Sequence, residues 1–179
     1  MKKTILSLVA VAGIAAAAPS AQAQSYNPFQ IGASGGVGFP TGDLGNATNT
    51  GYNIALVLGY KPALLPVSVR AEGAYNQFGF QNTGGNINIA SFTGNLAYEL
   101  PLGMSFTPYA IGGVGLYRPS ADLGGGNTGT TNDFGWNIGG GIKIPLSRSF
   151  ETFIEARYNS VNSNGTTFSF VPITVGVLF

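Results

Sequence analysis

Six charged residues offer the clearest chemistry in this sequence. Arg70 and Glu72 are two positions apart, as are Glu155 and Arg157, and in an extended strand such positions face the same side. Cations and carboxylates that share the inside of a narrow sheet can neutralise one another. We therefore expect an interior ion-pair network made of Arg70, Glu72, Glu99, Lys143, Glu155 and Arg157.

Chain order suggests partners within this network. If consecutive strands are neighbours, Arg70 can meet Glu99 and Lys143 can meet Glu155. The alternative is an interior filled with water, in which each charge is hydrated independently.

Several kinds of catalysis are excluded by composition. The sequence contains no His and no Cys, which removes the usual base of acyl transfer, thiolate nucleophiles and metal ligands, and disulfides. Asp43, Asp122 and Asp133 fall in or beside predicted loops, but isolated loop carboxylates are usually just solvated. We expect no enzyme activity, no cofactor and no metal site.

Alternation of apolar and small polar residues is the pattern that positions these charges. From Gln24 onward no segment has a 3.6-residue apolar period, whereas apolar residues recur at every second position. Charged residues make up 8% of the chain and Gly occurs 28 times, which suits alternating strands better than membrane helices. The pattern predicts eight strands, over about 29–39, 51–61, 67–76, 92–100, 106–118, 134–144, 150–159 and 170–179.

Two places in this pattern are ambiguous. Phe78 and Phe80 change parity after the third segment, which predicts a β-bulge near Gln77. In the fifth segment either face could be outward, and we favour the one formed by Ala110, Val114 and Leu116.

The connections between the segments are expected to alternate between long and short along the chain. Gly, Asn and Thr fill the long ones, of which 119–132 is the longest. Aromatic pairs such as Phe29 with Phe39 and Tyr52 with Tyr60 bracket the strands, as interfacial girdles do. If both chain ends are periplasmic, the external loops lie near Gly45, Gly84, Gly125 and Asn164.

The last segment has an apolar side that continues to its end, formed by Val171, Ile173, Val175, Val177 and Phe179. A soluble protein would rarely end on such a strand. A strand that closes a barrel in a bilayer meets hydrocarbon on that side and hydrogen-bonds to both neighbours. We therefore predict an all-β fold, an eight-stranded antiparallel up-and-down transmembrane β-barrel.

The first residues read as a secretory signal. Lys2 and Lys3 precede an apolar run over 5–18, and Ala21-Gln22-Ala23 has the small-x-small form of a cleavage site. We expect a signal peptide over 1–23, cleavage after Ala23 and a barrel domain over 24–179. Without Lys2 and Lys3 the chain keeps six Lys and Arg against seven Asp and Glu. It therefore lacks the excess of positive charge that is typical of proteins that bind nucleic acid.

Together these features resemble the small eight-stranded outer-membrane β-barrels of the OmpA-transmembrane-domain and OmpX kind. The resemblance rests on the signal, the strand and loop rhythm, and two motifs: Pro108-Tyr109 with Gly113-Val114-Gly115, and Ile173, Val175, Val177 and Phe179 at the end. It implies a monomer in the bacterial outer membrane. It also implies that the outer-membrane assembly machinery recognises the last strand through Ile173, Val175, Val177 and Phe179.

Three functions remain open on the sequence. The first is a non-enzymatic scaffold whose external loops contact outer-membrane lipid, lipopolysaccharide or surface partners. The second is a narrow pore or a lateral-diffusion transporter for small solutes. The third is a soluble exported β-barrel that binds an apolar ligand, with its apolar faces inward and Arg70, Glu72, Glu155 and Arg157 outward.

Overall fold

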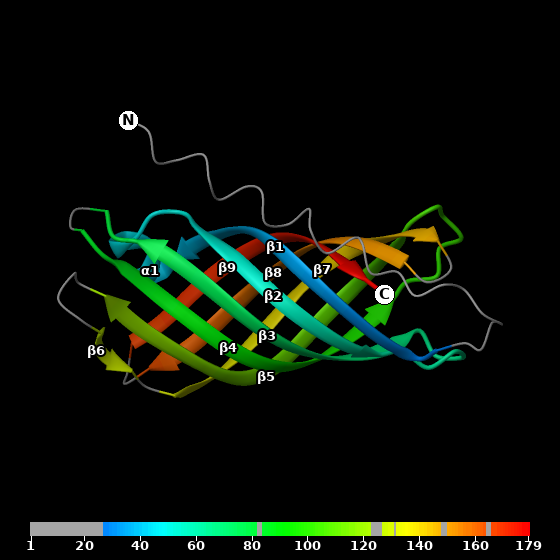
Figure 1. Ribbon diagram of the computed structural model, residues 1–179, viewed down its shortest axis with the longest axis horizontal. Coiled ribbons are helices and arrows are strands. Elements are labelled where there is room, and N and C mark those ends of the chain that lie inside the picture. Colours follow the sequence, from blue (N-terminus) through cyan, green and yellow to red (C-terminus); the bar gives the residue numbers. More distant parts are fainter. Residues whose placement is uncertain (1–26, 82–83, 123–126, 131, 148–149, 164–165) are drawn as a thin grey trace.

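The structure is a computed structural model that describes residues 27–81, 84–122, 127–130, 132–147, 150–163 and 166–179. The predicted signal peptide and its cleavage point lie outside these residues. The described chain forms a closed antiparallel barrel of tilted strands (Figure 1). No helix in this part of the chain is long and apolar enough to span a membrane.

Each strand pairs with the next along the chain, except that the sixth and seventh both pair with the fifth, and the last strand pairs with the first. Pairing of Ala33 with Val177 and of Val37 with Ile173 closes the barrel. The elements are β1 (Phe29–Thr41), α1 (Gly42–Ala47), β2 (Gly51–Tyr60), β3 (Val67–Gly79), β4 (Asn86–Glu99), β5 (Thr107–Asp122), β6 (Asn127–Thr130), β7 (Asp133–Ser147), β8 (Phe150–Ser163) and β9 (Thr166–Leu178). β6 and β7 pair with the same edge of β5, β7 along residues 107–117 and β6 along residues 120–122, so together they occupy one of eight positions around the barrel.

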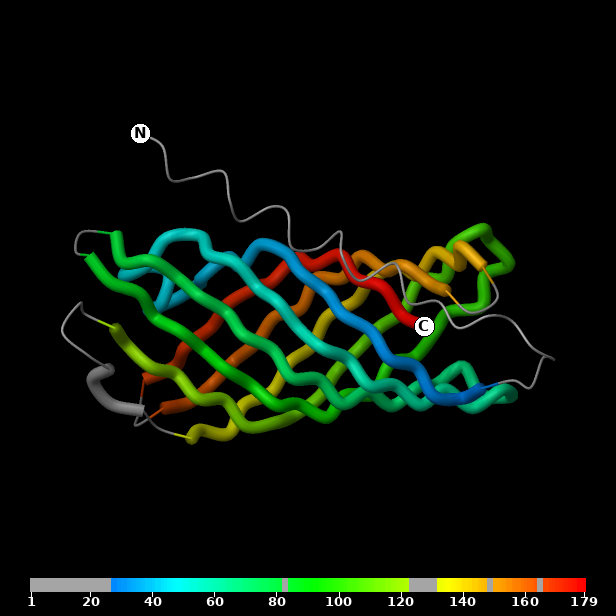
Figure 2. The backbone as a smooth tube through the Cα atoms, viewed as in Figure 1, coloured from blue at the N-terminus to red at the C-terminus, as the bar shows by residue number. Residues whose placement is uncertain are grey.

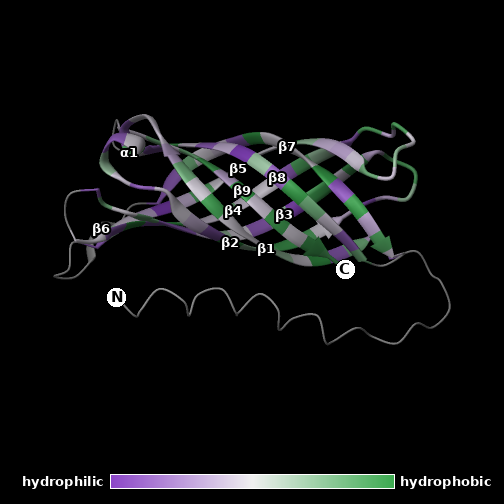
Figure 3. Ribbon diagram, turned by 90° about the horizontal axis from the view of Figure 1, so that it is seen from above, coloured by the Kyte–Doolittle hydropathy of each residue, from purple (hydrophilic) through white to green (hydrophobic). Residues whose placement is uncertain are grey.

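The two faces of each strand differ sharply in polarity, as the alternation predicts. Leu56 on β2 is 70% exposed, while its neighbours Ala55 and Val57 are buried in the interior. On β5, Val114 and Leu116 face outward, so the preferred assignment of the ambiguous segment is confirmed. Figure 3 shows hydrophobic and hydrophilic positions alternating along the strands. The apolar surface is thus on the outside of the barrel.

The β-bulge predicted near Gln77 is wrong. Gln77 pairs with Asn88 and Phe78 pairs with Ile87 in an unbroken register. Phe78 keeps the inward parity of Asn76 and is completely buried, because the interior at this height is apolar. The apparent change of parity at Phe78 therefore reflects an aromatic residue on the inner face, not a shift of register.

The expected alternation of long and short connections is also not observed. β3 ends at Gly79 and β4 begins at Asn86, so the connection between them is no longer than the connections before β3 and after β4. The predicted loops after β1 and β5 hold α1 and β6. The predicted loop centres Gly125 and Asn164 lie outside the described residues.

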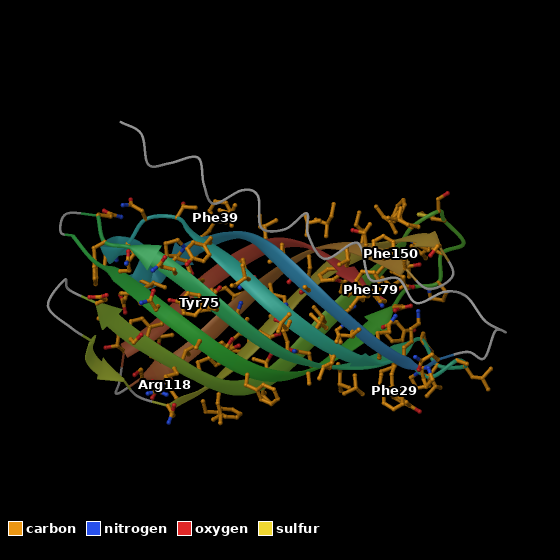
Figure 4. All side chains as sticks on the ribbon, in the orientation of Figure 1. Phe29, Phe39, Tyr75, Arg118, Phe150 and Phe179 are labelled. Atoms are coloured by element: carbon orange, nitrogen blue, oxygen red, sulfur yellow. The ribbon has the colours of Figure 1, made fainter. Side chains whose placement is uncertain are left out.

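We name the two ends of the barrel the α1 end and the Phe179 end. β1 begins and β9 finishes at the Phe179 end (Figure 2). There the ring centroids of Phe29 and Tyr60 are 5.2 Å apart, and those of Phe150 and Phe179 are 5.0 Å apart. Towards the α1 end, Tyr52 with Tyr75 and Trp136 with Tyr158 form similar pairs (Figure 4 labels Tyr75). These two groups of rings bracket the apolar surface.

Candidate functional site

The barrel interior holds all six charged residues of the predicted network. Arg157 reaches across it, with Nη2 at 2.6 and 2.5 Å from the two carboxylate oxygens of Glu72. Its Nε lies 2.6 Å from Oε1 of Glu155, whose Oε2 is 3.2 Å from Nη1 of Arg70. Two carboxylates and two guanidinium groups therefore form one continuous chain of ion pairs.

A second charged group lies at the Phe179 end. Lys143 forms an ion pair with Glu99, and Nζ of Lys61 lies 2.7 Å from the other oxygen of Glu99. Glu151 lies 3.9 Å from Lys143 and accepts a hydrogen bond from Nε2 of Gln30 at 3.3 Å. The predicted network does not include Lys61, Glu151 and Gln30, which have inward parity but lie at or next to the strand ends.

The partners predicted from chain order are wrong. Arg70 pairs with Glu155 instead of Glu99, and Lys143 pairs with Glu99 instead of Glu155. Arg70 stands opposite Asn95 in the β3–β4 register, four residues from Glu99, which lies too far along the barrel axis. Both observed pairs cross the lumen between strands that are not neighbours.

Aromatic rings enclose the innermost cation. The guanidinium carbon of Arg70 lies 5.0 Å from the ring centroid of Tyr109 and 5.5 Å from that of Phe153, within the range of cation–π attraction. The Tyr109 hydroxyl donates a hydrogen bond of 2.6 Å to Oε2 of Glu155. Strand alternation predicts Tyr109 on the inner face, but it does not predict the contacts of Tyr109 with Arg70 and Glu155.

Amide side chains fill the middle of the interior. Asn53 donates to Asn76 at 2.7 Å, and Asn137 donates to Asn95 at 2.9 Å. The Tyr117 hydroxyl donates to Oδ1 of Asn159 at 3.0 Å. A cavity between Asn53, Asn76 and the Glu72–Arg157 ion pair is about 20 Å³, room for a single water molecule. The middle of the lumen is packed.

An apolar plug closes the α1 end. Its centre is Leu44, which α1 inserts into a cluster completed by Phe78, Ile89, Tyr117, Val161 and Phe170. The loop is held in place because Oγ1 of Thr48 donates to the Leu44 carbonyl at 2.7 Å. Nε2 of Gln81 donates to the carbonyl oxygens of Gly45 and Thr48 at 3.2 and 3.1 Å. The predicted loop is thus folded into the barrel mouth.

Glycines on the inner face make this packing possible. A Cβ on Gly135 would lie 2.7 Å from the Tyr117 ring, and one on Gly38 would lie 2.9 Å from the Phe78 ring. Contacts this short do not occur between real side chains, so the rings occupy space that only glycine leaves.

None of the described side chains suggests a metal centre. No group of three or more His, Cys, Asp or Glu residues is close enough to hold an ion in this part of the chain. The chemistry of the interior is therefore ion pairing and hydrogen bonding.

A closed antiparallel barrel with an apolar outside and a polar, filled inside defines the class of transmembrane β-barrels. The chain belongs to the family of the outer membrane protein beta-barrel domain, whose model matches residues 6–179. The soluble ligand-binding alternative is wrong, because the apolar faces point outward and the four charges that it required outside are buried.

Solved structures of outer-membrane proteins share this fold. Neisserial surface protein A is 17% identical with a TM-score of 0.71, over 85% of this chain and 96% of that one. A major outer membrane protein from Thermus thermophilus is 13% identical with a TM-score of 0.53, over 86% and 99%. The outer membrane enzyme PagL is 18% identical with a TM-score of 0.52, over 84% and 98%. No curated protein matched the sequence.

Proposed function

We propose that this protein is a sealed, non-enzymatic barrel of the bacterial outer membrane, a scaffold that presents its α1 end to the outside. The observation that supports this most is the double closure of the lumen. Ion pairs from Arg157 to Glu72 and from Arg70 to Glu155 cross its middle, and the Leu44 plug fills its α1 end. A barrel filled in this way offers no path for solutes.

The orientation and the export route are part of the proposal. The proposal takes both termini as periplasmic, which places the Phe179 end at the periplasm. We propose cleavage after Ala23 and insertion by the outer-membrane assembly machinery through Ile173, Val175, Val177 and Phe179. The partners are then lipopolysaccharide and surface molecules at the α1 end.

A catalytic role has less support than the scaffold role. PagL shows that a barrel of this fold can be an enzyme. This sequence has no His and no Cys, and the carboxylates of its described interior are engaged with Arg, Lys or Tyr. The chain offers no activated nucleophile in the part that the structure describes.

Planar bilayer recording tests the sealed lumen. Refolded protein should insert and give no steady current, because ion pairs cross the middle of the lumen and the Leu44 plug fills its α1 end. Insertion is checked independently by the shift in electrophoretic mobility on boiling, which a folded barrel shows in SDS. Stable single-channel steps from inserted wild-type protein would contradict the proposal and favour the pore.

A further inference from the structure

The outer surface of β3, β4 and β5 near the α1 end carries an exposed cation. Arg118 keeps the outward parity of Leu116 and projects from the barrel wall (Figure 4). Of the Lys and Arg residues that the structure describes, Arg70, Lys143 and Arg157 are interior and Lys61 is at the other end. Arg118 is therefore the single outward cation at the α1 end in the described chain.

The strand register places a small residue beside Arg118, which is exposed. Arg118 is paired with Ala90, and Ala90 is paired with Tyr75. Only the methyl group of Ala90 stands between the ring and the guanidinium in this row, and we call this position the notch.

Hydrogen-bonding side chains lie beyond the notch. Gln77, Asn88 and Ser120 form the next outward row, since Gln77 pairs with Asn88 and Asn88 pairs with Ser120. All three are uncharged. Oδ1 of Asn88 is buried, and the Ser120 hydroxyl donates to the Asn88 carbonyl at 3.5 Å, so the row offers hydroxyl groups chiefly the Gln77 amide and the Ser120 oxygen as an acceptor.

An apolar strip lies on the membrane side of the notch. Leu116 is paired with Phe92, and both are largely exposed. Gly73 and Gly94 flank Phe92 in the register or along β4, and a Cβ added at either would meet nothing within 4 Å, so no side chain covers the Phe92 ring from these two positions. Hydrocarbon chains can lie against such a strip.

We propose that this surface binds one phosphorylated glycolipid of the outer leaflet. Its acyl chains lie on the strip around Phe92 and Leu116, a phosphate meets Arg118, and sugar hydroxyls meet Gln77 and Ser120. A guanidinium is the group best suited to bind phosphate through paired hydrogen bonds. A phospholipid would satisfy Arg118 but would leave the uncharged row without a sugar. The inference rests on the proposed function, because it needs the α1 end to face outward.

The opposite flank of the barrel lacks this combination. There Trp136, Ser160, Ser169 and Thr41 stand in one outward row, in register across four strands. The row has an aromatic ring and hydroxyl groups but no cation. Binding is therefore confined to the side of the barrel that carries Arg118.

Lipid titration of the refolded barrel in phosphatidylcholine nanodiscs tests the site. The probes are bisphosphorylated lipid A, the same lipid without its phosphates, and phosphatidylglycerol, with retained lipid counted by native mass spectrometry. Wild type should retain lipid A best, and Arg118→Gln should weaken that binding about tenfold, the loss expected for charge-assisted hydrogen bonds to phosphate. Arg118→Lys should recover part of it. Asn162→Gln, on the outer face of β8 on the opposite flank, should change nothing.

Three results would overturn the inference. Equal retention of lipid A and phosphatidylglycerol would show a general anion contact without sugar recognition. Equal loss of lipid A binding in Arg118→Gln and Asn162→Gln would show a nonspecific effect. No loss of lipid A binding in Arg118→Gln would show that Arg118 does not bind the phosphate. Each is independent of the sealed lumen, because Arg118 lies outside the barrel and bilayer current does not depend on it.

Discussion

Arg157 on β8 holds both oxygens of Glu72 on β3, and the two residues are 85 positions apart in the sequence. β2, β1 and β9 separate the two strands around the barrel. The pair therefore spans the lumen and ties opposite walls together.

Removing one member of this pair should be costly. Glu72→Gln leaves Arg157 with Glu155 alone, in a place with almost no water, and we expect a loss of about 3 to 5 kcal/mol in the free energy of unfolding. The double variant Glu72→Gln, Arg157→Gln should lose less than the sum of the single variants, as urea unfolding in detergent can measure. Additive losses would mean that the two side chains do not interact.

The two closures of the lumen should act independently. Phe78→Ala opens the plug but leaves the ion pairs, and Glu72→Gln with Glu155→Gln disrupts the ion pairs but leaves the plug. We expect no current from either variant and measurable conductance from their combination in planar bilayers. Current from Phe78→Ala alone would show that the ion pairs do not obstruct the lumen.

The lipid-facing side of β2 should not tolerate charge. Leu56→Arg places a cation in the middle of the apolar surface, where it should cost about 2 to 4 kcal/mol of folding free energy in a bilayer. Leu64→Arg is the matched control, because Leu64 is 94% exposed in the short connection after β2. Equal effects of the two changes would mean that Leu56 does not face lipid.

Inner and outer glycines should respond differently to the same methyl group. Gly135→Ala would push against the Tyr117 ring and the Ser160 carbonyl, and overpacking of this kind costs about 1 to 3 kcal/mol. Gly79→Ala, whose added Cβ would have one contact at 4.0 Å, should be neutral or slightly stabilising. Thermal unfolding of the two variants compares them directly, and a stable Gly135→Ala barrel would mean that the Tyr117 layer is loosely packed.

The role of Phe179 in assembly can be separated from its packing. The ring of Phe179 contacts that of Phe150, so Phe179→Ala and Phe150→Ala remove the same contact. If the assembly machinery reads the last strand, Phe179→Ala should lower the folded fraction in cells more than Phe150→Ala does. The two should refold alike in detergent. Equal folded fractions in cells would assign Phe179 a packing role alone.

The sequence predicted which side chains face the interior but not which of them form ion pairs. Strand alternation decided which side chains face inward, so Arg70, Lys143 and Glu155 were placed correctly in the interior. The partner of Arg70 was missed because alternation carries no information on height along the barrel axis. That height depends on how each strand is staggered against the next.

The plug was missed for a related reason. Phe78 has inward parity in an unshifted strand, but a phenylalanine was not expected in a polar lumen, so a bulge was inferred. Leu44 lies in a Gly- and Asn-rich stretch with no period at all. Its burial depends on α1 folding back over the mouth, a tertiary contact that local sequence does not encode.

The span of the Glu72 and Arg157 pair also has a consequence for how the barrel closes. Glu72 and Arg70 lie on β3 and their partners lie on β8, so a barrel that lacks β8 carries Glu72 without its cation and Arg70 without Glu155. Such a chain is poorly suited to hydrocarbon, because its inner charges still need water. Neutrality is reached only when the last strands join the sheet, which makes the cross-lumen pairs a built-in check that the barrel is complete before it commits to the lipid phase.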